Sequence, residues 1–584
     1  MKKIGIGYES YKRIVDDNCY YVDKTLLVRD VIDNAGMVTL FTRPRRFGKT
    51  LALSMLQTFF EEERDSDGNI IDNSHYFDGM KIMDSDKDIL DKMGKYPVIR
   101  LSLKSAKQPD FETAFLKLKE EICGEFERHG YLKKLMGDDR EQIEAYEDYE
   151  RGVYRWNQKV QSIDNDTDRR KEIVAEYGKY ATALKTLAKL LKKYHGRNAI
   201  ILIDEYDVPL ENAYQQGFYD EMIAFIRSLF ESALKTNDAL GFAIVTGCLR
   251  ISKESIFTGL NNLEVNSIRS RNFGEYFGFT GEETMAMLDE YNLSENADIV
   301  RSWYDGYLFG ECEVYNPWSV TKYVKEHYDA PEWFPEGYWS NTSSNAIIKR
   351  MVYNADDSVK TELDILISGG TIEKPIHEDI TYDDIDKSQD NLWNFLYFTG
   401  YMKKISERQE NDDIYITMAI PNKEVAGIYR NQIKEWFNER IKTTDYSPIY
   451  DAIIEKNVTK IEEFLCGLLS VSISYFDSEE SFYHGFLLSL LYGMPGYTAK
   501  SNRESGNGRP DIVLYPDCPK DPAYIFEIKS RKKFNEMGEG LTEAFEQIYD
   551  KKYEEGVIDD GYIGAVSFGI CFCKKSCIVG LYSR

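Results

Sequence analysis

The chain has 584 residues, which is more than one hydrophobic core organises, so about three or four domains are expected. Hydrophobic residues make up 42% of it and aromatic residues 14%, a composition that builds large cores and excludes an intrinsically disordered protein. The formal net charge of -26 excludes a chain that binds nucleic acid nonspecifically over its whole surface. Contact with nucleic acid would need a local basic patch or bound metal ions.

The sequence does not predict export or a membrane anchor. No long apolar segment follows residues 1–7, so no signal peptide is expected. No run approaches the roughly 20 apolar residues of a membrane span. The nine cysteines are spaced neither as a disulfide framework nor as a paired zinc clamp, so core cysteines are favoured over a metal site. We therefore expect a soluble, cytoplasmic protein in a reducing compartment.

The stretch 37–50 is read as an apolar strand, a basic loop and the start of a helix. The loop ends in Gly48, Lys49 and Thr50, which match the tail of a phosphate-binding P-loop. Gly48 lets the backbone approach phosphate, Lys49 reaches the β- and γ-phosphates, and the Thr50 hydroxyl holds Mg²⁺. The full pattern has glycine where this chain has Arg43, so a basic surface turn is the alternative.

The segment from about 111 to 195 is rich in charged helix formers, which predicts a solvated helical insertion. After it, the apolar run 199–203 ends in Asp204 and Glu205. Such a run is typical of a strand buried in a parallel sheet. Asp204 would then hold Mg²⁺, and Glu205 would orient or deprotonate the attacking water. A strand that ends in an ordinary polar turn is the alternative.

A third apolar strand, 241–246, ends in Thr246 and is followed by Arg250. A polar side chain at the end of a neighbouring strand is placed to sense the γ-phosphate, which is the role predicted for Thr246. Arg250 either stabilises transferred charge or pairs with an acidic surface residue. Further on, 391–425 predicts helix, strand, turn, strand and helix, an order compatible with a small winged helix.

The C-terminal part carries a second acidic constellation. Asp511 leads an apolar strand, and strand periodicity places Glu527 and Lys529 on one face of the next strand. A hairpin would bring Asp511 beside Glu527. Two carboxylates suit Mg²⁺ or Mn²⁺, and Lys529 would position or stabilise the attacking hydroxide, which fits a phosphodiester substrate. Two surface strands with ordinary charges are the alternative.

Other residues are assigned supporting roles around this constellation. Glu480 and His484 lie four residues apart on a predicted helix, so they share a face. Glu480 is the candidate upstream acid and metal ligand, whereas His484 either supports it or is structural. Gln547 is placed to line the site. A local basic patch is expected from Lys529, Arg531, Lys532 and Lys533.

Several motifs resemble the AAA-ATPase-like family of prokaryotic proteins. They are Tyr21-Val22-Asp23-Lys24-Thr25, Arg43-Pro44-Arg45-Arg46-Phe47-Gly48-Lys49-Thr50, Asp204-Glu205-Tyr206-Asp207, Tyr315-Asn316-Pro317-Trp318-Ser319 and Leu396-Tyr397-Phe398-Thr399-Gly400-Tyr401. That family also has arginine at the position of Arg43. The Pro-Asp and Glu-x-Lys motifs at 510–511 and 527–529 resemble the PD-(D/E)XK nuclease superfamily. The resemblance implies an ATPase module, a helical lid, a winged-helix-like segment and a nuclease.

The expected fold is α/β, in three parts. Residues 1–280 would form a P-loop domain with a parallel sheet, 281–445 a helical lid and winged-helix-like region, and 446–584 a restriction-endonuclease-like domain. ATP would be bound by Arg46, Gly48, Lys49, Thr50, Asp204, Thr246 and Arg250. Catalysis is assigned to Glu205, Asp511, Glu527 and Lys529. Metal ligands are assigned to Thr50, Asp204, Glu480, Asp511 and Glu527.

The predicted function is an ATP-binding and ATP-hydrolysing protein coupled to a Mg²⁺- or Mn²⁺-dependent nuclease that acts on DNA. The alternative is a nucleotide switch that binds nucleic acid without cutting it. The sequence leaves open DNA or RNA preference and the oligomeric state.

Overall fold

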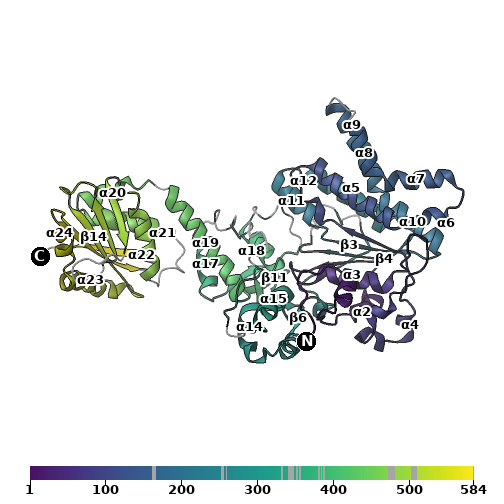
Figure 1. Ribbon diagram of the computed structural model, residues 1–584, viewed down its shortest axis with the longest axis horizontal. Coiled ribbons are helices and arrows are strands. Elements are labelled where there is room, and N and C mark those ends of the chain that lie inside the picture. The colour runs from purple at the N-terminus through teal and green to yellow at the C-terminus, as the bar shows by residue number, and fades with distance from the viewer. Residues whose placement is uncertain are drawn as a thin grey trace. The chain divides into compact units, whose positions relative to one another are not determined.

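The computed structural model (Figure 1) describes residues 1–160, 166–250, 256–257, 260–330, 333–339, 348–349, 351, 353, 357–378, 382, 385, 388–443, 445–470, 480–501 and 510–582. The chain forms two compact units. One comprises residues 1–343 and 372–426, and the other comprises residues 344–371 and 427–584. The boundaries predicted at 280 and 445 stay predictions.

The first unit is built on a parallel sheet with the strand order β2-β3-β4-β1-β5. Its strands are β1 (Val38–Thr42), β2 (Val98–Ser102), β3 (Ala199–Asp204), β4 (Leu240–Gly247) and β5 (Leu263–Asn266). β1 and β3 are buried along their whole length, as expected for strands covered on both faces. The carboxyl ends of parallel strands meet at one edge, so the loop after β1 and the acids after β3 share that edge, separated by β4.

Helices cover this sheet, and the insertion predicted at 111–195 is helical in its described parts (Figure 1). Its helices are α5 (Phe111–Arg128), α6 (Leu132–Leu135), α7 (Arg140–Glu150), α8 (Gly152–Val160), α9 (Asp166–Ala181) and α10 (Ala183–His195). The other helices around the sheet are α1 (Tyr11–Asp16), α2 (Leu27–Asn34), α3 (Lys49–Phe60), α4 (Lys87–Leu90), α11 (Val208–Gln216) and α12 (Tyr219–Phe230).

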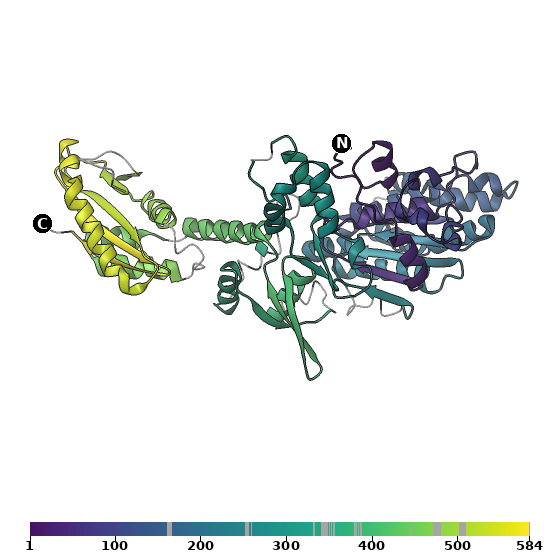
Figure 2. The same cartoon turned by 90° about the horizontal axis from the view of Figure 1, so that it is seen from below.

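The rest of the first unit adds two small antiparallel sheets. One has the order β6-β8-β7 and the other β10-β11-β9. Their strands are β6 (Phe279–Thr280), β7 (Tyr307–Phe309), β8 (Cys312–Tyr315), β9 (Ile372–Pro375), β10 (Lys403–Glu410) and β11 (Asp413–Ala419). The helices are α13 (Gly281–Glu290), α14 (Ala297–Tyr304), α15 (Pro317–His327) and α18 (Gln389–Phe398). The predicted hairpin is present, turns at Asn411 with φ 54°, and projects from the unit (Figure 2).

The second unit holds a mixed sheet with the order β12-β13-β14-β15-β16. Only β14 and β15 pair in parallel. Its strands are β12 (Tyr497–Ser501), β13 (Ile512–Pro516), β14 (Ala523–Ser530), β15 (Ala565–Cys573) and β16 (Ser576–Leu581). Its helices are α17 (Asp357–Ile367), α20 (Ser447–Ile454), α21 (Val458–Ser470), α22 (Glu480–Leu491), α23 (Met537–Lys551) and α24 (Tyr553–Asp559), and α19 (Lys423–Thr443) spans the boundary between the units.

The glycine-rich segment 502–509, which precedes Asp511, lies outside the described residues. Among the helices that the structure describes, none is both long enough and apolar enough to cross a bilayer.

Candidate active sites

The loop between β1 and α3 has the backbone of an anion-binding turn. Arg46 and Gly48 both take left-handed conformations, with φ 72° and 81°, and Gly48 is the residue that precedes α3. Glycine adopts this conformation without steric cost. Left-handed turns gather successive backbone N–H groups into a concave nest, and the first turn of a helix adds the positive end of its dipole. The loop is therefore suited to bind phosphate.

Arg43, which stands where the usual P-loop has glycine, is a buried anchor. Its guanidinium Nη1 donates to the carbonyls of Thr42 at 2.9 Å and Asn266 at 2.7 Å. The guanidinium carbon lies 5.1 Å and 5.2 Å from the ring centroids of Phe277 and Phe309. Complete burial lowers the pKa of Arg43 to about 9. The loop therefore starts from a side chain tied to β5, which accounts for the departure from the glycine pattern.

Phe47 and Pro44 fix the same loop to the remainder of the first unit. The Phe47 ring is buried, 4.9 Å from the ring of Tyr307 and 5.1 Å from that of Phe309, both in β7. Gly400 lies under Pro44, where an added Cβ would come within 2.8 Å of Pro44 Cβ. The phosphate-binding loop thus packs against the segments that follow the parallel sheet.

Lys49 lies along its own loop. Its Nζ donates to the carbonyl oxygens of Arg43 at 2.9 Å and Pro44 at 3.0 Å. Lys49 and Thr50 both line a cavity of about 340 Å³. The two residues are therefore placed at the helix N-terminus where the P-loop motif predicts them.

The acids after β3 lie at the same edge of the sheet. Asp204 is buried and accepts a hydrogen bond from the Thr246 hydroxyl. Glu205 has φ 52° and lines the cavity. Burial and the neighbouring Asp204 charge raise the pKa of Glu205, and the ammonium of Lys49 opposes this shift. A carboxylate with a raised pKa is suited to accept a proton. Thr246 is oriented toward Asp204, so its contact with a γ-phosphate stays a prediction.

The cavity extends from the P-loop to the N-terminal segment and α15. Its lining includes many aromatic side chains, which are those of Tyr8, Tyr20, Tyr21, Phe47, Tyr276, Phe279 and Trp318. The guanidinium carbon of Arg46 lies 4.2 Å from the Trp318 ring centroid, a cation–π contact between the P-loop and α15. One cavity is therefore lined by both cationic and aromatic side chains.

Two further arginines of this region, Arg45 and Arg250, differ in their positions relative to the cavity. Arg45 forms an ion pair with Glu211 of α11, so it links the loop to the helix after β3. Arg250 is half-buried and is not part of the cavity wall. Its assignment to nucleotide binding stays a prediction.

In the second unit, the β13–β14 hairpin brings the second constellation together. Ile512 pairs with Phe526, so Asp511, one residue earlier, faces Glu527 in the antiparallel register. Asp511 Oδ2 accepts from the Ile528 N–H at 2.8 Å. Lys529 Nζ donates to Glu527 Oε1 at 2.9 Å. The predicted juxtaposition of Asp511, Glu527 and Lys529 is therefore present.

Glu527 is the buried centre of this group. Its side chain is fully buried, and among the described residues its Oε2 has no hydrogen-bond partner. Burial and the Asp511 charge raise the pKa of Glu527 to about 7, although Lys529 opposes the shift. A buried carboxylate oxygen without a partner, next to a second carboxylate, fits a hard divalent cation that retains waters as its other ligands.

Lys529 is held on its other side by Gln547. Lys529 Nζ donates to Gln547 Oε1 at 2.8 Å, and Gln547 Nε2 donates to the Tyr553 hydroxyl at 3.2 Å. The turn between α23 and α24, where Lys552 has φ 54°, brings Tyr553 back toward Gln547.

Glu480 and His484 of α22 reach the site differently. Glu480 is exposed, and its charge contributes to the raised pKa of Lys529. His484 Nε2 contacts the carbonyl oxygen of Asp511 at 2.9 Å and Ser501 Oγ at 3.0 Å, so it ties strand ends together. Within the described residues no three His, Cys, Asp or Glu side chains are arranged to hold a metal ion. Metal binding by Glu480 stays a prediction.

Comparison with known proteins matches both regions. Residues 5–257 match the family model described as a predicted AAA-ATPase, and residues 478–581 match the model of the PD-(D/E)XK nuclease superfamily. We call residues 5–257 the AAA-ATPase-like region and residues 478–581 the PD-(D/E)XK domain, after the models that they match. These matches confirm the family resemblance expected from the motifs.

Two relatives add little about function. An uncharacterized protein in the vnfD 5' region of Azotobacter chroococcum mcd 1 is 27% identical over 342 residues, which are 58% of this chain and 54% of that protein. The chain thus spans about half the length of the curated relative it matches. The Walker-type ATPase PABY2304 of Pyrococcus abyssi is 14% identical, with a TM-score of 0.29 over 70% of this chain and 94% of that one.

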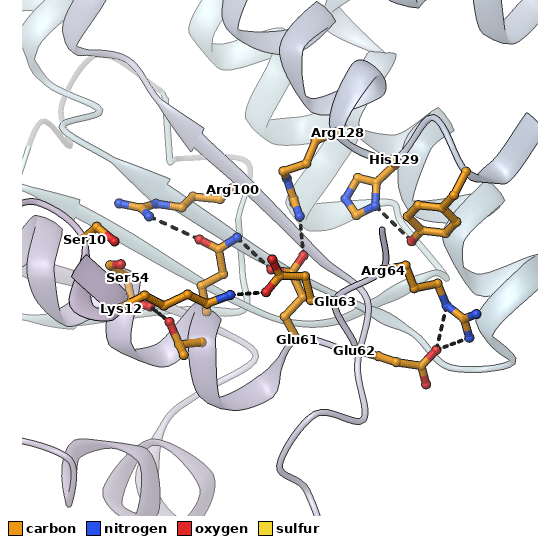
Figure 3. A pocket seen from close by; sticks show the side chains of 13 residues that line it. Ser10, Lys12, Ser54, Glu61, Glu62, Glu63, Arg64, Arg100, Arg128 and His129 are labelled. Atoms are coloured by element: carbon orange, nitrogen blue, oxygen red, sulfur yellow. Dashed lines mark hydrogen bonds and ion pairs between the residues drawn. The ribbon is translucent and has the colours of Figure 1, made fainter. Parts of the chain in front are cut away.

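The AAA-ATPase-like region also has a second, polar cavity of about 210 Å³ beside the last turns of α3. Figure 3 shows its charged side chains directed at one another. Lys12 pairs with Glu63, Arg64 with Glu62, and Arg128 with Glu61. Arg100 of β2 donates to Gln57 of α3 at 3.2 Å. These contacts join α1, the end of α3, β2 and α5. They therefore hold in place the helix that follows the P-loop.

Sequence reasoning missed the residues that fix the AAA-ATPase-like P-loop in place. In the sequence, Arg43 stands out only as a departure from the glycine of the P-loop pattern, and Phe47 and Gly400 only as parts of motifs. Phe47, an aromatic residue inside a basic loop, is the local feature that could have indicated a buried anchor. The partners of these residues lie far away in the sequence, so periodicity could not identify them.

Proposed function

We propose that the AAA-ATPase-like region binds ATP with Mg²⁺ in the cavity beside the P-loop and hydrolyses it. The cationic side chains of Lys49 and Arg46 suit the triphosphate. The aromatic side chains of the same cavity suit the purine base, because base–aromatic stacking contributes favourably whatever the base. Thr50 and Asp204 would hold the magnesium ion, which supplies charge neutralisation at the phosphates when bound.

Glu205 is the proposed proton acceptor for the attacking water. It lines the cavity, and burial together with the charge of Asp204 raises its pKa. The Thr246 hydroxyl holds Asp204 in place. This assignment depends on the cavity that joins Lys49, Thr50 and Glu205 to an aromatic wall.

The PD-(D/E)XK domain is proposed to cleave phosphodiester bonds in DNA. The Oε2 of Glu527, which has no hydrogen-bond partner in the described part of the chain and lies beside Asp511, carries this proposal. These two carboxylates would hold Mg²⁺ or Mn²⁺, which supplies Lewis-acid chemistry toward water and phosphate when bound. Lys529, fixed between Glu527 and Gln547, would orient the water and stabilise negative charge on the phosphate.

Cleavage of supercoiled plasmid tests this assignment. With Mg²⁺ or Mn²⁺, we expect Lys529→Ala and Glu527→Gln each to lose at least about 100-fold in rate, the scale of removing one charge-stabilising group. Lys520→Ala, at an exposed lysine in the β13–β14 turn, is the control and should cleave like wild type. Cleavage that persists in Lys529→Ala would remove the nuclease assignment.

Turnover of ATP tests the other site. Glu205→Gln should bind ATP like wild type but lose about 100-fold in hydrolysis rate, whereas Lys49→Ala should lose binding. Lys189→Ala, at an exposed lysine of α10, is the control. Equal, very slow turnover in wild type and Glu205→Gln would favour the nucleotide switch without fast hydrolysis.

A further inference from the structure

Two cysteines that are 111 residues apart in the sequence meet in the second unit. Cys466 lies on α21 and Cys577 on β16, and their sulfur atoms are 3.7 Å apart. Both are free thiols. Cys466 is half-buried and Cys577 is buried, so a small oxidant reaches the pair through Cys466.

The two cysteines are close because α21 covers the edge of the sheet at β16. β16 pairs only with β15 in the sheet order, which leaves outward N–H groups on alternate residues. The N–H of Cys577 donates to Cys466 Sγ at 3.3 Å, and that of Val579 donates to Glu462 Oε2 at 3.0 Å. Glu462 and Cys466 are one helical turn apart, about 6 Å, which matches the roughly 6.6 Å between alternate strand residues.

This contact also activates one of the thiols. The Cys577 thiol, 3.7 Å away, and the backbone N–H of Cys577 lower the pKa of Cys466. The thiolate is the form of cysteine that reacts with oxidants, and hydrogen-bond donors stabilise it. Cys466 is therefore the attacking sulfur, and Cys577 is the neighbour that resolves the product.

We propose that Cys466 and Cys577 form a reversible disulfide when the protein meets hydrogen peroxide, which locks α21 onto β16. The Cys466 sulfur attacks peroxide, an S–O bond forms, the O–O bond breaks, and the departing hydroxide takes a proton to become water. The Cys577 sulfur then attacks the sulfenic sulfur, the S–S bond forms and the S–O bond breaks. The departing hydroxide takes the Cys577 thiol proton and leaves as a second water. The two thiols lose two electrons and two protons, and peroxide accepts both.

The test uses the full-length reduced protein, treated with a small excess of hydrogen peroxide near neutral pH. A non-reducing tryptic digest should contain one peptide pair joined between residues 466 and 577, and dithiothreitol should release it. Cys466→Ser should abolish the pair. Cys518→Ser, at an exposed cysteine, is the matched control and should retain it.

A second variant separates chemistry from folding. In Cys577→Ser the sulfenic acid on Cys466 has no resolving partner, so it should be trapped by dimedone, whereas wild type should give little adduct. Absence of the 466–577 link in wild type, or a link that joins other cysteines instead, would overturn the proposal. The proposal would also be overturned if a Cys577→Ser protein that still melts cooperatively gave no dimedone adduct on Cys466.

Discussion

Arg43 and Phe47 are both buried, and both contact the Phe309 ring. They sit within a loop whose other residues are expected to meet phosphate. The anchors and the phosphate ligands therefore alternate within a few residues. Basic residues in such a loop are not equivalent, because Arg43 fixes the backbone, Arg45 pairs with Glu211, and Arg46 faces Trp318.

The ion pairs of the polar cavity provide a stability prediction (Figure 3). Glu61 is buried and pairs with Arg128. Glu61→Gln leaves Arg128 with Glu125 as its carboxylate partner, so it should destabilise the first unit by roughly 2 to 3 kcal/mol. Glu311→Gln, which breaks the exposed pair with Arg271, should change stability by less than about 0.5 kcal/mol. Urea unfolding measures both, and equal effects would contradict the argument.

Glu424 gives a pH prediction. It is buried, accepts from Ser319 Oγ and the Trp339 N–H, and burial raises its pKa to about 7. The folded state therefore holds this proton over a range where the unfolded state has lost it. Stability should fall as pH rises from about 4.5 to 7, by roughly 3 kcal/mol, and then stay level.

Comparison with Glu424→Gln isolates this effect, because glutamine does not titrate. Wild type should lose stability relative to the variant as the pH rises through that window, and the difference in unfolding free energy should be constant above pH 7. A difference that is independent of pH would show that Glu424 titrates normally in the folded protein.

At the level of elements, the P-loop lies where three parts of the first unit meet. β1 and α3 supply its ends, β7 supplies the aromatic support, and the turn after α18 supplies Gly400 beneath Pro44. The residues that follow the parallel sheet are thus part of the nucleotide site's support. A segment that contacts the P-loop in this way is suited to respond to a ligand bound there.

Gly400→Ala tests that support. Gly400 has φ 89°, and a Cβ would collide with Pro44. Gly68 has φ 88°, with no atom within 4 Å of an added Cβ. Both substitutions to alanine should cost about 1 kcal/mol of backbone strain, but Gly400→Ala alone should weaken ATP binding, by roughly 10-fold. Calorimetric titration with ATP checks this, and equal affinities would exclude a role for the contact.

At the scale of the whole molecule, one chain carries two separate acidic sites. The proposed coupling is that ATP occupancy in the first unit changes the rate at which the second unit cleaves DNA. If the sites are coupled, plasmid cleavage should depend on ATP in wild type and should lose that dependence in Lys49→Ala.

Binding itself has a separate readout. ATP at about 100 times its dissociation constant should stabilise the first unit by roughly 2.7 kcal/mol, and Lys49→Ala should abolish the shift in melting temperature. Cleavage that is identical with and without ATP, while the melting shift is present, would show two independent activities.

The sequence by itself determined the P-loop, the acids after β3 and the Asp511, Glu527 and Lys529 group. Each depends on short-range information: an apolar run, a strand period of two, or a hairpin that pairs neighbouring strands. These signals also predicted the parallel sheet, the helical insertion and a strand, turn and strand within 391–425, where the structure has a hairpin at residues 403–419.

Only the tertiary structure decided what surrounds these sites. The contacts of Arg43 with Asn266, of Arg46 with Trp318, of Gly400 with Pro44 and of Cys466 with Cys577 join residues more than 100 positions apart. No local period encodes such pairs, because they arise when elements from distant parts of the chain pack against one another. Packing therefore makes Arg43, which stands where the P-loop pattern has glycine, a buried anchor. It also brings Cys466 and Cys577 together.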